Sequence, residues 1–252
     1  MQIDKGKVAL VVGAGASAGI GGAIARRAAA EGLHVFVAGR TQEKLDALVS
    51  EIEAAGGKAT AIVADTTQAD DVARMFDVAE KEAGLPDLVI YNAGNNRFAP
   101  LTEMSDSFFE DLWRLCAFGG FLVGREMARR VLPEDGGVRD TQATLIFTGA
   151  TASMRARPPF TAFASAKAAE RALAHGMARE FGKRGLHVAH AVIDGIVDGN
   201  QVRSRLPEYL DAKGEDGGLD PDAVADAYWT LHMQNQTTWT LEMDLRPAKE
   251  EF

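Results

Sequence analysis

Lys167 lies four residues after Phe163 in the run FTAFASAKAAERALAHGMARE, whose small residues predict a helix. Residues four apart stand on the same face of a helix. A lysine beside a tyrosine at this spacing would be a proton-transfer device, because a nearby ammonium favours the ionised phenol. Here the aromatic residue has no hydroxyl, so the residues leave open what the lysine binds.

Composition limits the classes of partner. The formal net charge of the 252 residues is -9, so we expect no nucleic-acid partner. Cys116 is the one cysteine and the five histidines show no metal-ligand spacing, so neither a disulfide nor a metal site is expected. No stretch approaches the roughly 18 apolar residues of a membrane span, and no targeting segment is recognised at the start. We therefore expect a cytoplasmic protein without a membrane partner.

Short apolar runs alternate with longer amphipathic segments along the chain. This order predicts an α/β fold, a single Rossmann-type domain over residues 1–252 with a doubly wound parallel sheet and helices on both faces. The polar segment 198–220 is predicted to be a loop or lid. In the tail 237–252, Trp239 and Leu241 are predicted to form an edge strand or to cap a neighbour. The predicted strands cover 7–12, 34–38, 59–64, 87–91, 143–147 and 187–193.

The glycine-rich stretch VVGAGASAGIGGAIARR follows the first predicted strand and opens a helix. Gly13 and Gly15 permit a tight turn, while Gly19 and Gly21 permit close approach to a diphosphate at the helix N-terminus. An ordinary strand-to-helix turn is the alternative. After the second strand, Arg40 stands where an NAD site usually has an acidic residue, which favours NADP(H) over NAD(H). Otherwise Arg40 only begins the next helix.

These motifs, with others further along, resemble the short-chain dehydrogenase/reductase family over nearly the whole chain. The resemblance also rests on Asp65-Thr66, on NAG at 92–94, on the 163–167 segment and on DG after the sixth strand. It implies that Asp65 meets adenine, that 92–94 pack under the cofactor, and that Lys167 binds the nicotinamide ribose. The implied cofactor-binding set is Gly13, Gly15, Ser17, Gly19, Ile20, Gly21, Arg40, Asp65, Thr66, Asn92, Ala93, Gly94, Lys167, Gly195, Ile196 and Val197.

The resemblance also implies a catalytic serine, tyrosine and asparagine, and all three are substituted. Ala150, Phe163 and Cys116 stand at the matching positions, and only Lys167 is kept. Asp194, where the family usually has proline, is a candidate proton-carrying carboxyl or a helix cap. The other candidate donors have structural alternatives as loop-capping or lid-packing residues; they are Thr148, Thr151, Ser153 and Tyr209.

The missing groups matter energetically. A general acid supplies about 10²- to 10⁴-fold and an oxyanion donor about 10²- to 10³-fold, so ordinary carbonyl reduction is not expected. We expect instead an NADP(H)-binding oxidoreductase that reduces an activated C=C or C=N bond of a small molecule. The alternatives are a catalytically silent cofactor-binding sensor or partner subunit, and lyase or isomerase chemistry. Lys167 is expected to be a cofactor ligand rather than a partly solvated helix residue. The resemblance further implies a homodimer or homotetramer.

Overall fold

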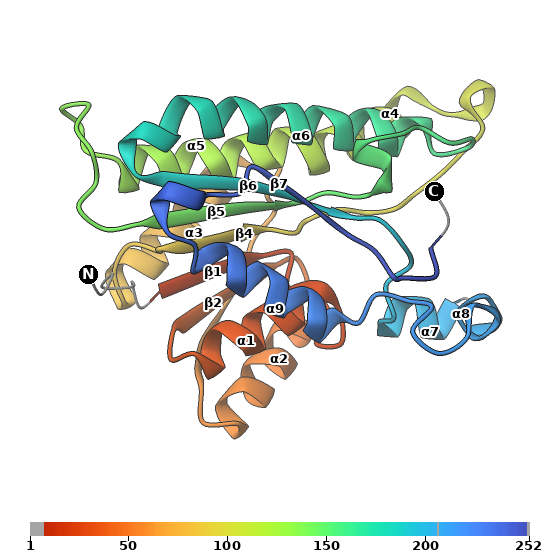
Figure 1. Cartoon of the computed structure of the whole chain (residues 1–252), viewed down its shortest axis with the longest axis horizontal. Coiled ribbons are helices and arrows are strands. Elements are labelled where there is room, and N and C mark those ends of the chain that lie inside the picture. The colour runs from red at the N-terminus through yellow and green to blue at the C-terminus, as the bar shows by residue number, and fades with distance from the viewer. Residues whose placement is uncertain (1–7, 206, 251–252) are drawn as a thin grey trace.

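A seven-stranded parallel sheet runs through the middle of the molecule (Figure 1). The computed structural model describes residues 8–205 and 207–250. The strand order is β3-β2-β1-β4-β5-β6-β7. Successive strands are added outward from β1 to β3 on one side and then from β4 to β7 on the other, which is the doubly wound arrangement. The strands are β1 (Val8–Val12), β2 (His34–Gly39), β3 (Lys58–Val63), β4 (Leu88–Tyr91), β5 (Ala143–Thr148), β6 (Leu186–Ile193) and β7 (Glu242–Leu245).

Helices cover both faces of this sheet. Figure 1 shows α5 and α6 on one side and α1, α2 and α9 on the other. The α-helices are α1 (Ile20–Ala30), α2 (Gln42–Ala54), α3 (Ala69–Glu82), α4 (Asp106–Trp113), α5 (Gly119–Val131), α6 (Thr161–Phe181), α7 (Asn200–Arg205), α8 (Pro207–Lys213) and α9 (Pro221–His232). The short helices are η1 (Leu101–Glu103), the π-helix η2 (Arg114–Phe118), η3 (Thr151–Ser153), η4 (Gly182–Arg184) and η5 (Gln236–Thr238).

The hydrophobic core forms two layers, one on each face of the sheet. Side chains of α3, α5 and α6 fill the first layer, and those of α1, α2 and α9 fill the second. Strands β1, β5 and β6 are buried along their whole length, as expected for parallel strands covered on both faces. The fold class is therefore confirmed. The six predicted strands match within one residue, apart from residue 7, which lies outside the described residues.

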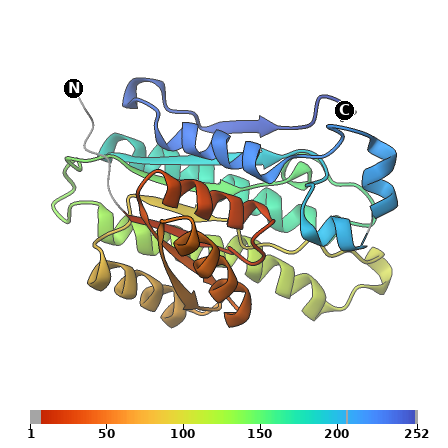
Figure 2. The ribbon, with the colours of Figure 1, turned by 90° about the horizontal axis from the view of Figure 1, so that it is seen from below.

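In two segments, the structure differs from the sequence-based expectation. Segment 198–220 contains the helices α7 and α8 rather than only a loop. Its ends are tied together, because the Leu219 amide donates to the Ile196 carbonyl at 2.7 Å. The tail adds the edge strand β7 beside β6. This strand begins at Glu242, so Trp239 and Leu241 precede the strand instead of forming it. Figure 2 shows β7 at the edge of the sheet.

Glu242 on β7 links this edge strand to the neighbouring β6 and α6. Its carboxylate accepts hydrogen bonds from Arg171 at 2.6 and 2.8 Å and contacts ring nitrogens of His175 and His190 at 3.0 Å each. Hydrogen bonding to Arg171 lowers the pKa of Glu242 to about 2, against the opposing effect of burial. Burial lowers the pKa of His190 to about 4. The strand is thus held by charge-assisted bonds as well as by its ladder.

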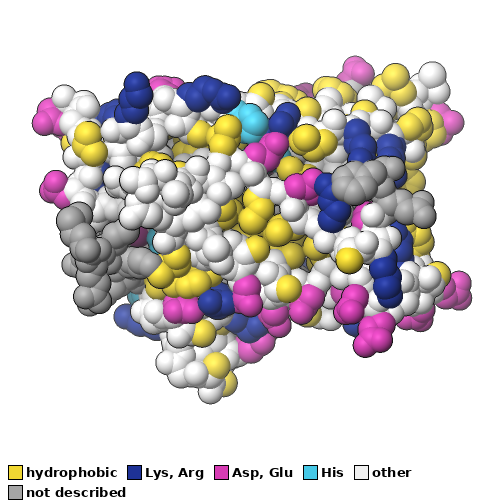
Figure 3. Space-filling view, viewed as in Figure 1, with side chains coloured by type: hydrophobic (Ala, Val, Ile, Leu, Met, Phe, Trp, Pro, Cys, Tyr) yellow, Lys and Arg dark blue, Asp and Glu magenta, His cyan; other side chains and the backbone are white. Residues whose placement is uncertain are grey.

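The face of the molecule seen in Figure 1 carries several kinds of side chain. Figure 3 shows hydrophobic side chains among Lys, Arg, Asp and Glu on this face. Trp229, Met243 and Leu245 are partly buried hydrophobic residues packed on the core layer that includes α9. None of the described helices is both long and apolar enough to span a bilayer.

We predict that Glu242→Gln lowers the free energy of unfolding at pH 7 by about 1.5–3 kcal/mol, the range for hydrogen bonds to charged groups. Because the folded-state pKa of Glu242 lies below its ordinary 4.5, the carboxylate stabilises fully above pH 4.5. This contribution is lost as the pH falls toward 2. Urea unfolding of both proteins at pH 7, 4.5 and 3 measures their free energies of unfolding, and the difference between the two should become smaller as the pH falls.

The matched control is Glu53→Gln on the exposed side of α2, which we expect to change stability by about 0.5 kcal/mol or less. A loss for Glu242→Gln no larger than for this control would contradict the anchoring role. His190 adds a separate acid effect in the parent protein. Its folded-state pKa lies below 6.5, so the unfolded state takes up the proton first and stability falls between pH 6.5 and 4.

Candidate functional site

The glycine loop after β1 is held against the end of β4. Gly13 has φ +87°, and a Cβ there would lie 2.5 Å from the Ala93 amide nitrogen. The side-chain amide of Asn92 donates to the Gly13 carbonyl at 2.9 Å. At Gly21, a Cβ would lie 2.7 Å from the same carbonyl. Only glycine fits these two positions, so the loop and the start of α1 are fixed close together.

The loop ends at the N-terminus of α1. Gly19 is the N-cap and provides no side-chain hydrogen bond, so the first amide groups of α1 have no side-chain cap and suit an anion. The Ser17 hydroxyl is already engaged with Glu51 and with Arg26. Ile20 is half-buried and packs on the core layer of α1. The backbone therefore fits a diphosphate better than the Ser17 side chain does.

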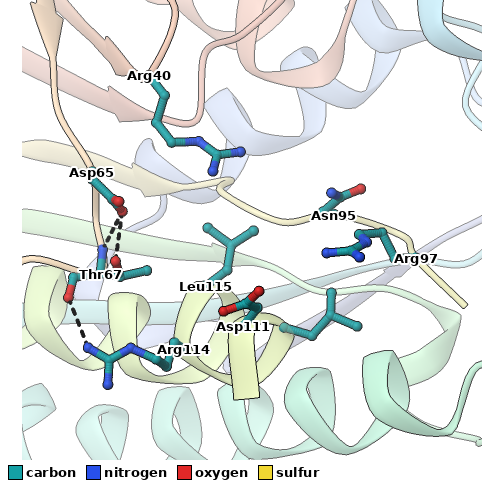
Figure 4. Close-up of a pocket in the computed structure, with 9 residues that line it drawn as sticks. Arg40, Asp65, Thr67, Asn95, Arg97, Asp111, Arg114 and Leu115 are labelled. Atoms are coloured by element: carbon teal, nitrogen blue, oxygen red, sulfur yellow. Dashed lines mark hydrogen bonds between the residues drawn. The ribbon is translucent and has the colours of Figure 1, made fainter. Parts of the chain in front are cut away.

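A pocket of about 230 Å³ opens at the carboxyl ends of β2, β3 and β4. Figure 4 shows Arg40 reaching toward it, and Arg40 lies before α2 rather than in its first turn. Three arginines and two aspartates contribute to the lining, although the whole chain is acidic. The lining residues are Arg40, Asp65, Thr67, Asn95, Arg97, Asp111, Leu112, Arg114 and Leu115.

Asp65 and Thr66 have different surroundings. The Asp65 carboxylate accepts from the amide and the hydroxyl of Thr67, both at 2.9 Å, and these bonds shape the turn after β3. The Thr66 side chain is buried, and its hydroxyl lies 3.5 Å from that of Tyr91. Asp65 therefore lines the pocket while Thr66 packs beneath it.

Lys167 extends from α6 toward Gly94, which precedes the pocket residue Asn95. Lys167 is only 4% exposed. The alternative expectation of a partly solvated helix residue therefore does not hold. The Lys167 ammonium donates to the Thr148 carbonyl at 2.8 Å and to the Glu170 carboxylate at 2.6 Å. A Cβ on Gly94 would lie 3.4 Å from Lys167 Nζ. The missing side chain of exposed Gly94 thus leaves the cleft open beside the ammonium.

Glu170 is a site residue that the sequence analysis missed. Its side chain is fully buried, and its Oε1 has no hydrogen-bond partner among the described residues. Burial raises the pKa of Glu170 to about 7, against the attraction of Lys167. Burial acts to lower the pKa of Lys167, but its pairing with Glu170 raises it overall. An acidic residue three positions after Lys167, on the same face of a helix predicted to be buried, was the available signal.

The three substituted positions meet in one apolar cluster. Cys116 is fully buried, Phe163 is 7% exposed, and Ala150 packs against them. Burial raises the pKa of the Cys116 thiol, although Lys167 opposes the shift, so a buried filler fits better than a nucleophile. The remaining members are Leu112, Ala162, Ala166, Met104, Phe108 and Ala152. The structure therefore brings together the positions matched by sequence and surrounds them with hydrocarbon.

The alternative hydroxyl donors all have partners. Thr148 accepts from the Tyr228 hydroxyl at 3.0 Å, and the Ser153 hydroxyl accepts from the Ala150 amide at 3.1 Å. The Thr151 hydroxyl donates to Asp194 at 2.6 Å. These contacts correspond to the structural alternatives for the three hydroxyl groups.

Asp194 connects the end of β6 to the loop after β5. Besides Thr151, its carboxylate pairs with Arg155 at 3.2 Å and with Arg246 at 3.7 Å. This arrangement anchors the loop, and the proton-carrying role of Asp194 stays a prediction. Tyr209 on α8 is 52% exposed.

Residues 195–197 face the segment around Leu219. A Cβ on Gly195 would lie 2.7 Å from Pro247 Cδ, so the tail packs directly on this turn. The Ile196 carbonyl accepts from the Leu219 amide, and Val197 forms an isolated parallel bridge with Leu219. The Ile196 carbonyl is therefore already engaged, and contacts of this turn with a carboxamide stay a prediction.

Two histidines come closer together in the fold than their spacing in the sequence suggests. His175, His190 and Glu242 come together so that their ligand atoms lie within 4.8 Å of one another, a grouping able to hold a metal ion. The three residues come from α6, β6 and β7, so their spacing along the chain does not reveal the cluster. The Arg171 guanidinium already supplies the positive charge beside Glu242.

Comparison with known proteins places these features in a family. The family described as short chain dehydrogenase matches residues 7–209. Among curated proteins, the chain resembles the uncharacterized oxidoreductase YuxG of Bacillus subtilis, with 32% identity over 224 residues. That match covers 88% of this chain and 31% of YuxG. The chain therefore spans about a third of the length of that relative.

Two solved structures extend the similarity to the whole fold. A short-chain dehydrogenase from Rhodopseudomonas palustris has 40% identity and a TM-score of 0.78, covering 95% of this chain and 98% of that chain. A metagenomic short-chain oxidoreductase in complex with NADP has 25% identity and a TM-score of 0.80, covering 97% of this chain and 98% of that chain.

We predict that Phe163→Ala lowers the free energy of unfolding by about 3–5 kcal/mol, because it leaves a cavity in a packed apolar cluster. Urea unfolding at pH 7 measures the change. The control is Phe98→Ala, since Phe98 is 60% exposed and contacts only the Phe160 ring among the aromatic residues. We expect that variant to lose about 1 kcal/mol or less. Equal losses would show that Phe163 is not a packing residue.

Proposed function

This chain belongs to the short-chain dehydrogenase family, and we propose that it is an NADP(H)-dependent oxidoreductase that reduces an activated C=C or C=N bond. The observation that carries the proposal is the apolar packing of Phe163, Cys116 and Ala150 beside a retained Lys167. Such a site binds a cofactor with the lysine but offers no hydroxyl to a developing alkoxide. An acceptor that forms no alkoxide suits it best.

The choice of NADP(H) rests on Arg40. A guanidinium at the end of β2 pairs well with a 2′-phosphate, because its charge and its forked donors match phosphate oxygens. Arg40 lines the same pocket as Asp65, the residue expected at the adenine. The relative that was solved with NADP supports the same choice.

The residues of the chain fit this cofactor from end to end. The N-terminus of α1 has no side-chain cap and is open to a diphosphate, and Gly94 adds no side chain beside Lys167. When bound, the nicotinamide supplies a hydride to the substrate. Lys167 would bind the ribose hydroxyls, and the cluster around Phe163 would exclude water from that side. Hydride addition to one atom of the C=C or C=N bond leaves the other atom to take a proton from solvent.

A catalytically silent cofactor-binding protein is the second candidate. The same apolar packing favours it, because the hydroxyls of Thr148, Thr151 and Ser153 are engaged in the fold. The two candidates share every contact with the cofactor and differ only in turnover. A panel of acceptors therefore separates them.

Association with a second copy of the chain is also part of the proposal. Phe109, Trp113 and Phe121 are between 38% and 41% exposed on α4 and α5, which supports a homodimer or homotetramer built on these helices. Both the assembly and the cytoplasmic location stay predictions.

We predict that Arg40→Ala raises the Kd for NADPH about 10- to 100-fold, which corresponds to losing about 1.5–3 kcal/mol of charged hydrogen bonds. The Kd for NADH should stay unchanged, because NADH has no 2′-phosphate. Fluorescence titration of each reduced cofactor measures both constants. The control is Arg129→Ala at the exposed end of α5. Equal changes for NADPH and NADH would contradict the assigned contact.

We predict that the parent protein oxidises NADPH with enones or imines and is slow with ketones. In the variant Phe163→Tyr/Ala150→Ser, ketone reduction should rise at least about 100-fold, because a proton donor and an oxyanion donor are restored. NADPH consumption measures the rates, and NADPH affinity of both proteins is the control. Flat ketone reduction with intact binding would contradict the positions assigned to the two residues. Tight binding without turnover on the whole panel would favour the silent candidate.

A further inference from the structure

Lys167 presents a problem that the cofactor site alone does not solve. An ammonium group buried to this extent needs a counter-charge, since the desolvation of a lone charge costs several kcal/mol. The residue at position 163 cannot supply one, because a phenylalanine ring has no ionisable group. The Thr148 carbonyl accepts one N–H of Lys167 but carries no full charge. The charge must come from elsewhere.

We propose that Glu170 is the positioning residue for Lys167 and holds its ammonium toward the ribose of the bound cofactor. The inference rests on the proposed function, because it assumes that NADP(H) lies in the cleft beside Gly94. An ammonium has three N–H donors. Thr148 and Glu170 take two of them, and the third is left for the open side where Gly94 lacks a Cβ.

The arrangement of α6 supports this role. Phe163, Lys167 and Glu170 follow one another at helical spacing on one face, so the carboxylate approaches the ammonium from the side away from Phe163. The pair is short, at 2.6 Å, and both side chains are at most 5% exposed. Solvent therefore screens the attraction little, and the pair restrains the long lysine side chain. Rotation of Lys167 away from Thr148 would also separate it from Glu170.

The titratable groups that face Glu170 or Lys167 have pKa values away from pH 7. Tyr91 on β4, Cys116 on η2 and Tyr228 on α9 interact with it electrostatically, and burial raises the pKa of each of the three. His190 on β6 faces Lys167, and burial lowers its pKa to about 4. None of these groups changes charge near pH 7. Among Glu170 and these groups, Glu170 is the one whose pKa burial moves to about 7.

A double-mutant cycle tests whether Glu170 acts through Lys167. The four proteins are the parent, Glu170→Leu, Lys167→Met and the double variant, and the Kd for NADPH is measured by fluorescence titration at pH 8. We expect Glu170→Leu to raise the Kd about 10-fold or more in the parent. In the Lys167→Met background the same change should have no further effect, because there is no ammonium left to position.

Glu170→Gln distinguishes positioning from general damage. Its amide oxygen can still accept from Lys167 but supplies no counter-charge, so we expect a Kd between those of the parent and Glu170→Leu. Glu180→Gln, at an exposed position of the same helix, is the matched control and should leave the Kd unchanged. If Glu170→Leu fails to fold, the double variant, in which no buried charge is left unpaired, is compared with Lys167→Met alone.

The protein without cofactor provides an independent measurement. Because the folded-state pKa of Glu170 lies above its ordinary 4.5, the folded state keeps the proton longer, and its contribution to stability falls as the pH rises from 4.5 to 7. We expect the unfolding free energy of the parent to show this fall relative to Glu170→Gln, which cannot titrate. Parallel pH profiles would mean that Glu170 stays ionised beside Lys167 over this range, and the double-mutant cycle would then decide its role.

Other outcomes separate the two proposals. Additive losses in the cycle, or a parent-like Kd in Glu170→Leu, would overturn the role of Glu170 while the proposed function stands. No binding of NADPH by the parent protein would overturn the proposed function, and the positioning role with it. A Glu170→Gln variant as weak as Glu170→Leu would also overturn positioning by a hydrogen bond.

Discussion

A buried ammonium and the carboxylate that balances it are the interaction on which this site depends. Lys167 is held inside the protein by Glu170 and by the Thr148 carbonyl. Burial of a charge is tolerable only when the charge is paired and hydrogen-bonded. Glu170 and Thr148 meet that requirement, so the remaining N–H group of Lys167 is available toward Gly94. Position 163 therefore does not need a polar side chain to balance the lysine.

The substitutions at 116, 150 and 163 are therefore consistent with one another. A polar group at position 116 or 163, where the present side chains are buried, would need a hydrogen-bond partner there or would cost free energy. Carbon and sulfur pack there at no such cost. The three substitutions thus form one apolar cluster and are not isolated replacements.

Helix α6 connects this site to the edge of the sheet. One side of it carries Phe163, Lys167 and Glu170, while Arg171 and His175 reach Glu242 on β7. The tail that supplies β7 also packs Pro247 against Gly195 at the turn expected near the nicotinamide. Both ends of the cleft thus depend on elements that lie far apart in the sequence.

The sequence by itself determined the strands, the parallel sheet and the glycine loop, because these follow from local periodicity and from backbone freedom at Gly13 and Gly21. It also predicted roles for Arg40, Lys167 and the three substituted positions. In the structure Arg40 lines the pocket, and the three substituted positions pack in one apolar cluster. Only the tertiary structure decided what balances Lys167, since burial, not spacing, turns Glu170 from a helix-surface residue into a counter-charge. The cluster of His175, His190 and Glu242 likewise arises from contacts between α6, β6 and β7, which no local pattern encodes.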